Sequence, residues 1–142
     1  RSVFRENLKY VADEMAEIGT RVIVEPLNPA IRENAMLTTS DETMDLLNEI
    51  GHPNLGLEYD AFHMHVTEGN MAETVQKYLP HIGNIQIADV PGRHEPGTGS
   101  IDYDAFLGAL DKMGYSNWVA CEYTPVGSTI DGLGWLRKWL EA

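Results

Sequence analysis

Four segments of the chain have the pattern of strands, and each one ends near a side chain that could bind a metal ion. In chain order these are Glu25 in VIVEPLN, Asp60 in LGLEYDAFH, Gln86 in IGNIQIADV and Glu122 in WVACEY. They are 35, 26 and 36 residues apart, each about the length of one strand–helix–strand unit. Because the carboxyl ends of successive parallel strands converge on one face, these side chains should meet there. Three carboxylates and an amide oxygen predict a site for a hard divalent cation, Mg or Mn rather than Zn.

Each of these residues also has a simpler interpretation. Glu25 and Glu122 stand in segments otherwise rich in Val, Ile, Ala and Cys, and either could be an outward-facing residue near a strand end. A carboxylate inside an apolar strand is costly unless it is paired or bound to metal, and recurrence at equivalent places favours a shared site. His63 follows Asp60 by three residues and brings an imidazole to the same strand end. It could contact a substrate or a metal, or be a hydrogen-bonded core residue.

The loop PGRHEPGTGS follows the strand of Gln86 and should lie on the face where the site is built. Its Arg93 offers a planar guanidinium that suits a substrate carboxylate, although a surface arginine beside Glu95 is the alternative. His94 and Glu95 could contact and orient the residues that bind the substrate or the metal. Alternatively, the loop uses these two side chains to fold over the site.

Apolar residues at three- to four-residue spacing, together with capping residues, predict helices between these strands. The expected helices cover residues 2–19, 39–51, 71–82, 102–113 and 129–142. One helix followed by four strand–helix units predicts an α/β domain over residues 1–142, with parallel strands and right-handed crossovers. Two architectures remain, an open doubly wound sheet or part of an eight-stranded barrel. The absence of a Gly-x-Gly-x-x-Gly turn favours half a barrel.

Composition excludes several classes of function. A net charge of −12 argues against a nucleic-acid partner, yet it does not exclude a small anionic substrate held by a buried arginine. No apolar run approaches the roughly 20 residues that span a membrane. The single Cys121 cannot form an internal disulfide, and the first ten residues lack the layout of a signal peptide. We therefore expect a cytoplasmic protein. Cys121 and all three tryptophans, Trp118, Trp135 and Trp139, are expected in the core.

The chain resembles the xylose-isomerase-like TIM barrels, and within them the hydroxypyruvate isomerases. The resemblance lies in four stretches: VEPLNP, LEYDAFHMHVTEGN, NIQIADVPGRHEPGTGSIDY and GYSNWVACEYTPVGSTIDGLGWL. With the helices between them, these stretches account for nearly the whole chain. The chain looks like the C-terminal half of a (β/α)8 barrel, strands 5–8, from the fourth helix to the eighth.

The resemblance implies a role for each candidate residue. Glu25 and Glu122 look like the paired catalytic glutamates, which also bind the metal, and Asp60 and Gln86 complete the metal set. The substrate-contacting pair would be His63 and Arg93. Ketose 3-epimerases generally have histidine where this chain has Gln86. Zinc endonucleases of the superfamily have an Asp-x-His pair where it reads Gly92-Arg93-His94.

The expected activity is therefore a metal-assisted interconversion of hydroxypyruvate and 2-hydroxy-3-oxopropanoate, with glutamates moving a proton through an enediolate. Isomerisation of 2-oxo-tetronate and a related ketose epimerisation are the enzymatic alternatives. A metal-stabilised domain that binds sugar acids without turnover is the non-enzymatic one. Four strands leave two open edges and should expose apolar interior side chains. We expect the N-terminal half of the barrel, or a second copy in a homo-oligomer, to cover them.

Overall fold

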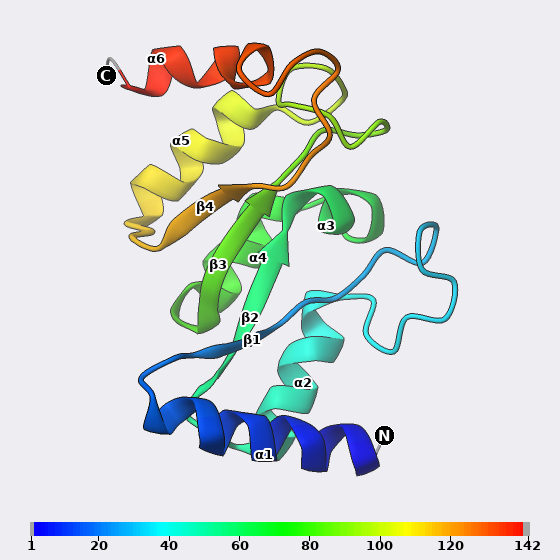
Figure 1. Ribbon diagram of the computed structural model, residues 1–142, viewed down its shortest axis with the longest axis vertical. Coiled ribbons are helices and arrows are strands. Elements are labelled where there is room, and N and C mark those ends of the chain that lie inside the picture. The colour runs from blue at the N-terminus through cyan, green and yellow to red at the C-terminus, as the bar shows by residue number, and fades with distance from the viewer. Residues whose placement is uncertain (1, 141–142) are drawn as a thin grey trace.

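A computed structural model describes residues 2–140 and contains a four-stranded parallel sheet (Figure 1). The strands lie in the order of the chain: β1 (Val22–Val24), β2 (Leu55–Asp60), β3 (Ile82–Ile87) and β4 (Trp118–Cys121). In a doubly wound sheet the strand order would reverse at some point, whereas in a barrel each strand pairs with the next. The predicted half of a (β/α)8 barrel is therefore confirmed, with β1 and β4 at its two open edges.

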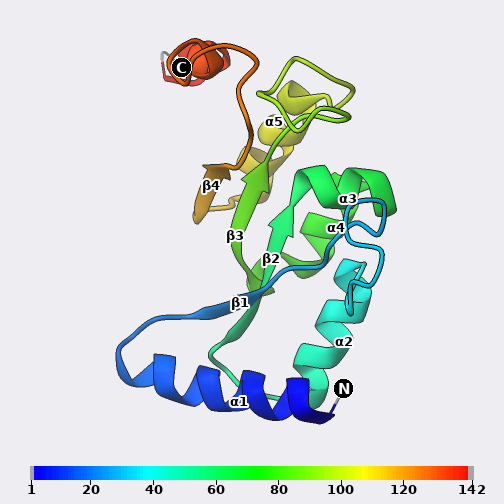
Figure 2. The same cartoon turned by 45° about the vertical axis from the view of Figure 1, so that its right-hand side comes forward.

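Helices connect the strands, and α2, α4 and α5 lie along one side of the sheet (Figure 2). The helices are α1 (Ser2–Glu17), α2 (Ser40–Ile50), α3 (Ala61–Thr67), α4 (Met71–Tyr78), α5 (Tyr103–Met113) and α6 (Arg137–Leu140). Two 3-10 segments, η1 (Leu79–His81) and η2 (Asp131–Leu136), precede β3 and α6. No helix within residues 2–140 is long and apolar enough to cross a membrane.

Local capping explains several of these bounds. The Thr39 hydroxyl accepts a hydrogen bond from the Glu42 amide at 3.1 Å, and Gly51 ends α2 in the left-handed conformation, as predicted. Asn70 precedes α4, but in the described chain its side chain makes no capping hydrogen bond. The final helix begins at Asp131 rather than 129 and starts as a 3-10 turn. Its predicted last two residues, 141–142, lie outside the described part.

The two faces of the sheet differ in chemistry because successive side chains alternate between them. Leu57 and Tyr59 of β2 are completely buried, and so are Ile85 and Ile87 of β3. The opposite face carries polar side chains, among them the hydrogen-bonded pair of Glu58 and Asn84. The expectation of exposed apolar side chains on the open face holds in part: Trp118, the register partner of Asn84, is 83% exposed, whereas Glu58 and Asn84 make the middle of this face polar.

Strand β4 departs from the expected burial. Trp118 is 83% exposed and Cys121 is also exposed, although both were predicted in the core. Trp118 is in register with Asn84 and so lies on the open face, and β4 is an edge strand with a neighbouring strand on one side alone. Trp135 and Trp139, near the C-terminus, are each partly buried, and Trp135 packs against the core.

Candidate metal and substrate site

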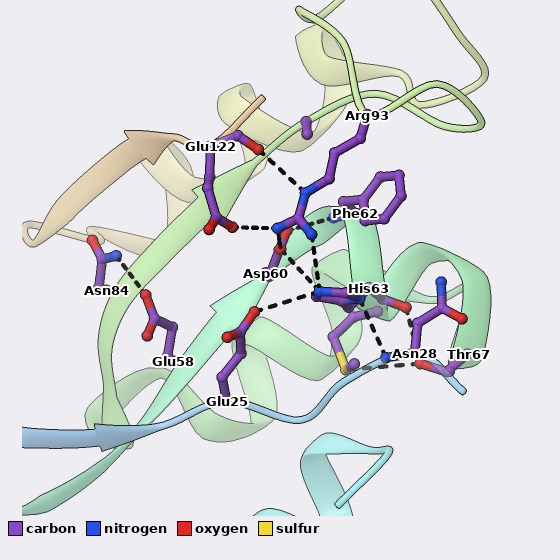
Figure 3. Close-up of polar contacts among 12 residues, drawn as sticks. Glu25, Asn28, Glu58, Asp60, Phe62, His63, Thr67, Asn84, Arg93 and Glu122 are labelled. Carbon is purple, nitrogen blue, oxygen red and sulfur yellow. Dashed lines mark hydrogen bonds and ion pairs between the residues drawn. The ribbon is translucent and has the colours of Figure 1, made fainter. Parts of the chain in front are cut away.

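The four predicted metal ligands all lie at the carboxyl ends of the strands, and Figure 3 shows three of them, Glu25, Asp60 and Glu122. Glu25 follows β1 directly, and Asp60 is the last residue of β2. Gln86 in β3 is the register partner of Asp60. Glu122 follows β4, and its amide donates to the Ile87 carbonyl at 3.1 Å, extending the pairing of β3 with β4. The parallel topology thus places these residues at one end of the sheet.

Three side chains form a compact cluster at this end. Each of Glu25, Asp60 and His63 offers a ligand atom that lies within 4.8 Å of the other two. The His63 Nε2 atom is 3.6 Å from Glu25 Oε1 and 3.6 Å from Asp60 Oδ2. Asp60 is 1% exposed, His63 is 2% and the Glu25 side chain is 28%. These three residues are a candidate metal site.

Asp60 is held by a second interaction that explains its position. It caps α3, because its Oδ1 accepts the Phe62 amide at 2.9 Å. The other oxygen, Oδ2, is thereby left to face His63 and Arg93. One carboxylate therefore both begins a helix and contributes to the site.

Arg93 reaches into the centre of the site from the loop after β3. Its Nη2 donates to Asp60 Oδ2 at 3.0 Å and to Glu122 Oε2, and its Nη1 is 3.5 Å from His63 Nε2. The guanidinium carbon stands 4.9 Å from the centroid of the Phe62 ring. Glu122 is consequently paired with Arg93 and does not belong to the compact cluster. The guanidinium neutralises two carboxylates that a cation would otherwise share.

The ring of His63 is fixed by the backbone. The Asn28 amide donates to His63 Nδ1 at 3.2 Å, so in the neutral ring the proton resides on Nε2. Burial, followed by the charge of Arg93, lowers the pKa of His63 to about 4, so the ring is neutral near pH 7. Its Nε2–H then faces the two carboxylate oxygens, each 3.6 Å away, without making a hydrogen bond to them. Binding a metal through Nε2 would require the proton to move to Nδ1 and would break the contact with Asn28.

The carboxylates themselves are crowded. Burial, and then the charges of Asp60, Glu58 and Glu122, raises the pKa of Glu25 to about 7. Burial likewise raises the pKa of Asp60 to about 6, while the Phe62 amide and Arg93 oppose the rise.

Two buried oxygens, Glu25 Oε1 and Gln86 Oε1, accept no hydrogen bond from any of the described residues. A buried polar oxygen without a partner is costly. A divalent cation held by Glu25 and Asp60 would give the Glu25 oxygen a partner and relieve the repulsion between the carboxylates, and Gln86 lies on the strand beside Asp60. The residues therefore fit such a group.

His94 and Glu95 tie two loops together. The His94 ring nitrogen Nδ1 is 2.6 Å from the Thr124 carbonyl, and Glu95 Oε2 accepts the Val126 amide at 3.0 Å. Both interactions join the loop after β3 to the segment after β4. The geometry supports the interpretation that these residues fold the loop over the site.

Sequence reasoning missed three residues that contact the site. Asn28 fixes the His63 ring, Phe62 stacks on Arg93, and Glu58 raises the pKa of Glu25. Glu58 was detectable, because it lies two residues before Asp60 on the same strand and therefore on the same face. Asn28 and Phe62 act through contacts with residues far away in the sequence, and no local sequence pattern predicts such contacts.

The fold and the site define the class of protein. Residues 1–139 match the family described as Xylose isomerase-like TIM barrel, and the chain belongs to that family. A 2-oxo-tetronate isomerase of Pectobacterium atrosepticum is 39% identical over 99% of this chain and 54% of its own length. A putative hydroxypyruvate isomerase of Mus musculus is 38% identical over 97% of this chain and 50% of its own length.

Among solved structures, that of an AP endonuclease, family 2, from Brucella melitensis superposes with a TM-score of 0.93. It is 34% identical, and the alignment covers 97% of this chain and 54% of that one. The chain thus spans about half the length of the relatives that it matches. Both of these curated relatives are isomerases by their names.

Proposed function

We propose that this chain carries the catalytic residues of a metal-assisted isomerase that interconverts hydroxypyruvate and 2-hydroxy-3-oxopropanoate. The observation that carries the proposal is Glu25, a carboxyl group with a pKa of about 7 beside Asp60 and a neutral His63. A general base works best when its pKa lies near the working pH, and in the metal-free protein Glu25 meets that condition.

Two glutamates supply the proton chemistry. Glu25 follows β1 and Glu122 follows β4, the two edge strands of the sheet, so a substrate over the ends of β2 and β3 would have one of these carboxyl groups on each side. In the proposed reaction Glu25 removes a proton from C3 of hydroxypyruvate. Glu122 returns a proton to C2 of the enediolate, while the proton on O3 passes to O2, so that C3 becomes the aldehyde carbon and C2 carries the hydroxyl group. Glu122 must leave its contact with Arg93 to do so.

The other side chains bind and orient the substrate. Arg93 would hold the substrate carboxylate through its guanidinium fork, and the His63 Nε2–H would donate to a substrate oxygen. Glu25, Asp60, Gln86 and Glu122 would hold the divalent cation. When bound, that cation supplies Lewis-acid stabilisation of negative charge on the substrate oxygens.

Isomerisation of 2-oxo-tetronate, a four-carbon homologue, is the second candidate. It is favoured by a specific observation, since relatives of that name are 39% and 36% identical to this chain. The chemistry at the two reacting carbons is the same, so the site described above serves both. The difference lies in the length of pocket beyond those carbons. We propose that the remainder of the barrel, from an N-terminal half or a second copy, forms that part.

The endonuclease and epimerase alternatives are less well supported by the residues. A net charge of −12 repels a phosphate backbone. In the loop after β3, Gly92 stands where the zinc endonucleases would place the aspartate of their Asp-x-His pair. Gln86 stands where ketose epimerases generally have histidine. These substitutions favour the isomerase.

A substrate panel with deuterium exchange tests the proposal. Hydroxypyruvate and 2-oxo-tetronate are each supplied with Mg2+ in D2O, and deuterium at the carbon next to the carbonyl is followed by NMR. Glu25→Gln and Glu122→Gln should each slow exchange by about 100-fold or more. Glu58→Gln, on the same face of the sheet, is the matched control, and its exchange rate should fall much less. A loss below about tenfold for either catalytic variant refutes the proton-transfer roles. Binding without any exchange identifies a sugar-acid-binding domain instead.

A further inference from the structure

Asp89 follows β3 and is 1% exposed, and its carboxylate is surrounded by backbone amides. Oδ1 accepts from the amides of Val90 at 2.9 Å and Ile101 at 3.1 Å. Oδ2 accepts from the amides of Gly97 and Gly99, both at 2.9 Å. Four donors fill the usual capacity of a carboxylate, so this side chain gathers the whole loop from residue 90 to residue 101 around itself.

The backbone of Asp89 brackets Arg93. The Arg93 amide donates to the Asp89 carbonyl at 2.9 Å, and the Asp89 amide donates to the His94 carbonyl at 2.8 Å. Arg93 has a φ of 52°, a left-handed conformation that a residue with a side chain adopts only when its surroundings impose it. The bracket therefore fixes the point from which the guanidinium extends.

The loop tolerates little change where it meets Asp89. A Cβ added at Gly99 would come within 2.0 Å of the Val90 carbonyl oxygen and 2.6 Å of Asp89 Oδ1. On the far side, the Arg93 carbonyl accepts the Thr124 amide at 2.9 Å. Arg93 is thus held between a close-packed turn and the segment after β4.

We infer that Asp89 is a positioning residue, which places the Arg93 guanidinium for recognition of the substrate carboxylate. The inference rests on the proposed function for the role of Arg93. All the hydrogen bonds that the Asp89 carboxylate makes in the described chain are with backbone amides of its own loop, and none is with a candidate metal ligand. It acts through the loop, because its carboxylate sets the path that brings residue 93 over the strand ends.

Asp89→Asn tests the inference with the smallest change in shape. The substitution replaces one carboxylate oxygen by an NH2 group. That group cannot accept hydrogen bonds, so it would face two backbone N–H groups that have lost their acceptor. The loop must move, and Arg93 moves with it. A displacement of about 1 Å at a binding group can reduce turnover by about 100-fold, and here we expect a 10- to 100-fold loss. The loss should fall mainly on KM, because the carboxylate is bound in both the ground state and the transition state.

A double-mutant cycle separates positioning from general destabilisation. The readouts are KM for hydroxypyruvate and, independently of turnover, the calorimetric affinity for tartronate, a dicarboxylate probe, in the presence of Mg2+. If Asp89 acts through Arg93, then Asp89→Asn should change neither value by more than about twofold in an Arg93→Met background. The matched control is Asp102→Asn, which makes the same change of charge at the exposed cap of α5, at the end of the same loop, and leaves an oxygen to accept the Ala105 amide. Its effect should be small and equal in both backgrounds.

Each outcome is decisive. Full additivity of Asp89→Asn with Arg93→Met overturns the inference while leaving the proposed function intact. If Arg93→Met binds tartronate as tightly as the original protein, the role of Arg93 in the proposed function fails instead. Should Asp89→Asn not fold, Gly97→Ala replaces it, because its added Cβ meets no atom within 4 Å and strains only a φ of 93°. A loss of tartronate affinity in this variant that persists undiminished with Arg93→Met would equally refute positioning.

Discussion

Replacing Glu25 by glutamine should stabilise the metal-free protein, and only above a certain pH. Burial, reinforced by neighbouring carboxylates, raises the pKa of Glu25 from 4.5 to about 7. The folded protein therefore holds this proton more tightly than the unfolded chain does. The resulting stability is fully present below pH 4.5 and is lost as the pH rises through 7. Glutamine resembles the protonated form and cannot lose the proton, so the variant keeps that stability.

The size of the effect follows from the two pKa values. A rise from 4.5 to about 7 corresponds to roughly 3 kcal/mol of unfolding free energy. The variant should match the original protein near pH 4.5 and exceed it by up to about 3 kcal/mol at pH 8. His63, with its pKa lowered to about 4, has the opposite dependence, since its stability rises between pH 4 and 6.5. Both proteins contain His63, so this contribution largely cancels in their difference.

Urea unfolding in EDTA at pH 5 and pH 8 measures the difference directly. Glu58→Gln is the matched control, because Glu58 is one of the charges that raise the pKa of Glu25. It should give a smaller gain in the same direction. A difference between Glu25→Gln and the original protein that is equal at both pH values would refute the reasoning about burial and charge at this site.

Three further predictions concern the metal, the histidine and the open edges. Mg2+ or Mn2+ at about 100 times its dissociation constant should raise the unfolding free energy by about 2.7 kcal/mol, and Asp60→Asn should abolish most of that gain in a thermal melt. In 15N NMR at pH 7 the His63 ring should be neutral with its proton on Nε2, and a proton on Nδ1 would contradict the contact with Asn28. The 142-residue chain alone should self-associate at micromolar concentration through β1 and β4, and Trp118→Lys should weaken that association. Sedimentation showing a well-folded monomer with a cooperative melt would disprove it.

Local rules explain what could be predicted of the fold. The cap at Thr39 and the glycine ends at Gly51 and Gly114 depend on residues a few positions apart, so the sequence displays them directly. Helix α3 was not predicted. It has only seven residues, and it begins at Ala61, directly after the last residue of β2. The exposure of Trp118 was also missed. The apolar composition of β4 suits a strand flanked on both sides, whereas here one side is open.

The sequence predicted where the site lies, but it did not predict which side chains contact one another there. Strand spacing alone brings Glu25 and Asp60 to the same end of a parallel sheet. Which side chains pair there depends on how loops from different units fold over that end. The contact of Arg93 with Glu122 and the bracket at Asp89 arise in this way. Both need the three-dimensional path of the loop after β3, for which the sequence has no periodic signature.

The two roles of Asp60, capping α3 and contributing to the site, have a consequence for how such a protein would evolve. One oxygen starts α3 and the other faces the guanidinium, so an asparagine with its oxygen on the helix side would preserve the cap. The charge would be lost while the fold remained. After gene duplication, a single substitution of this kind would remove the site carboxylate from one copy while that copy still folds. Descendants that have abandoned the chemistry but kept the barrel should therefore show asparagine at this position more often than alanine.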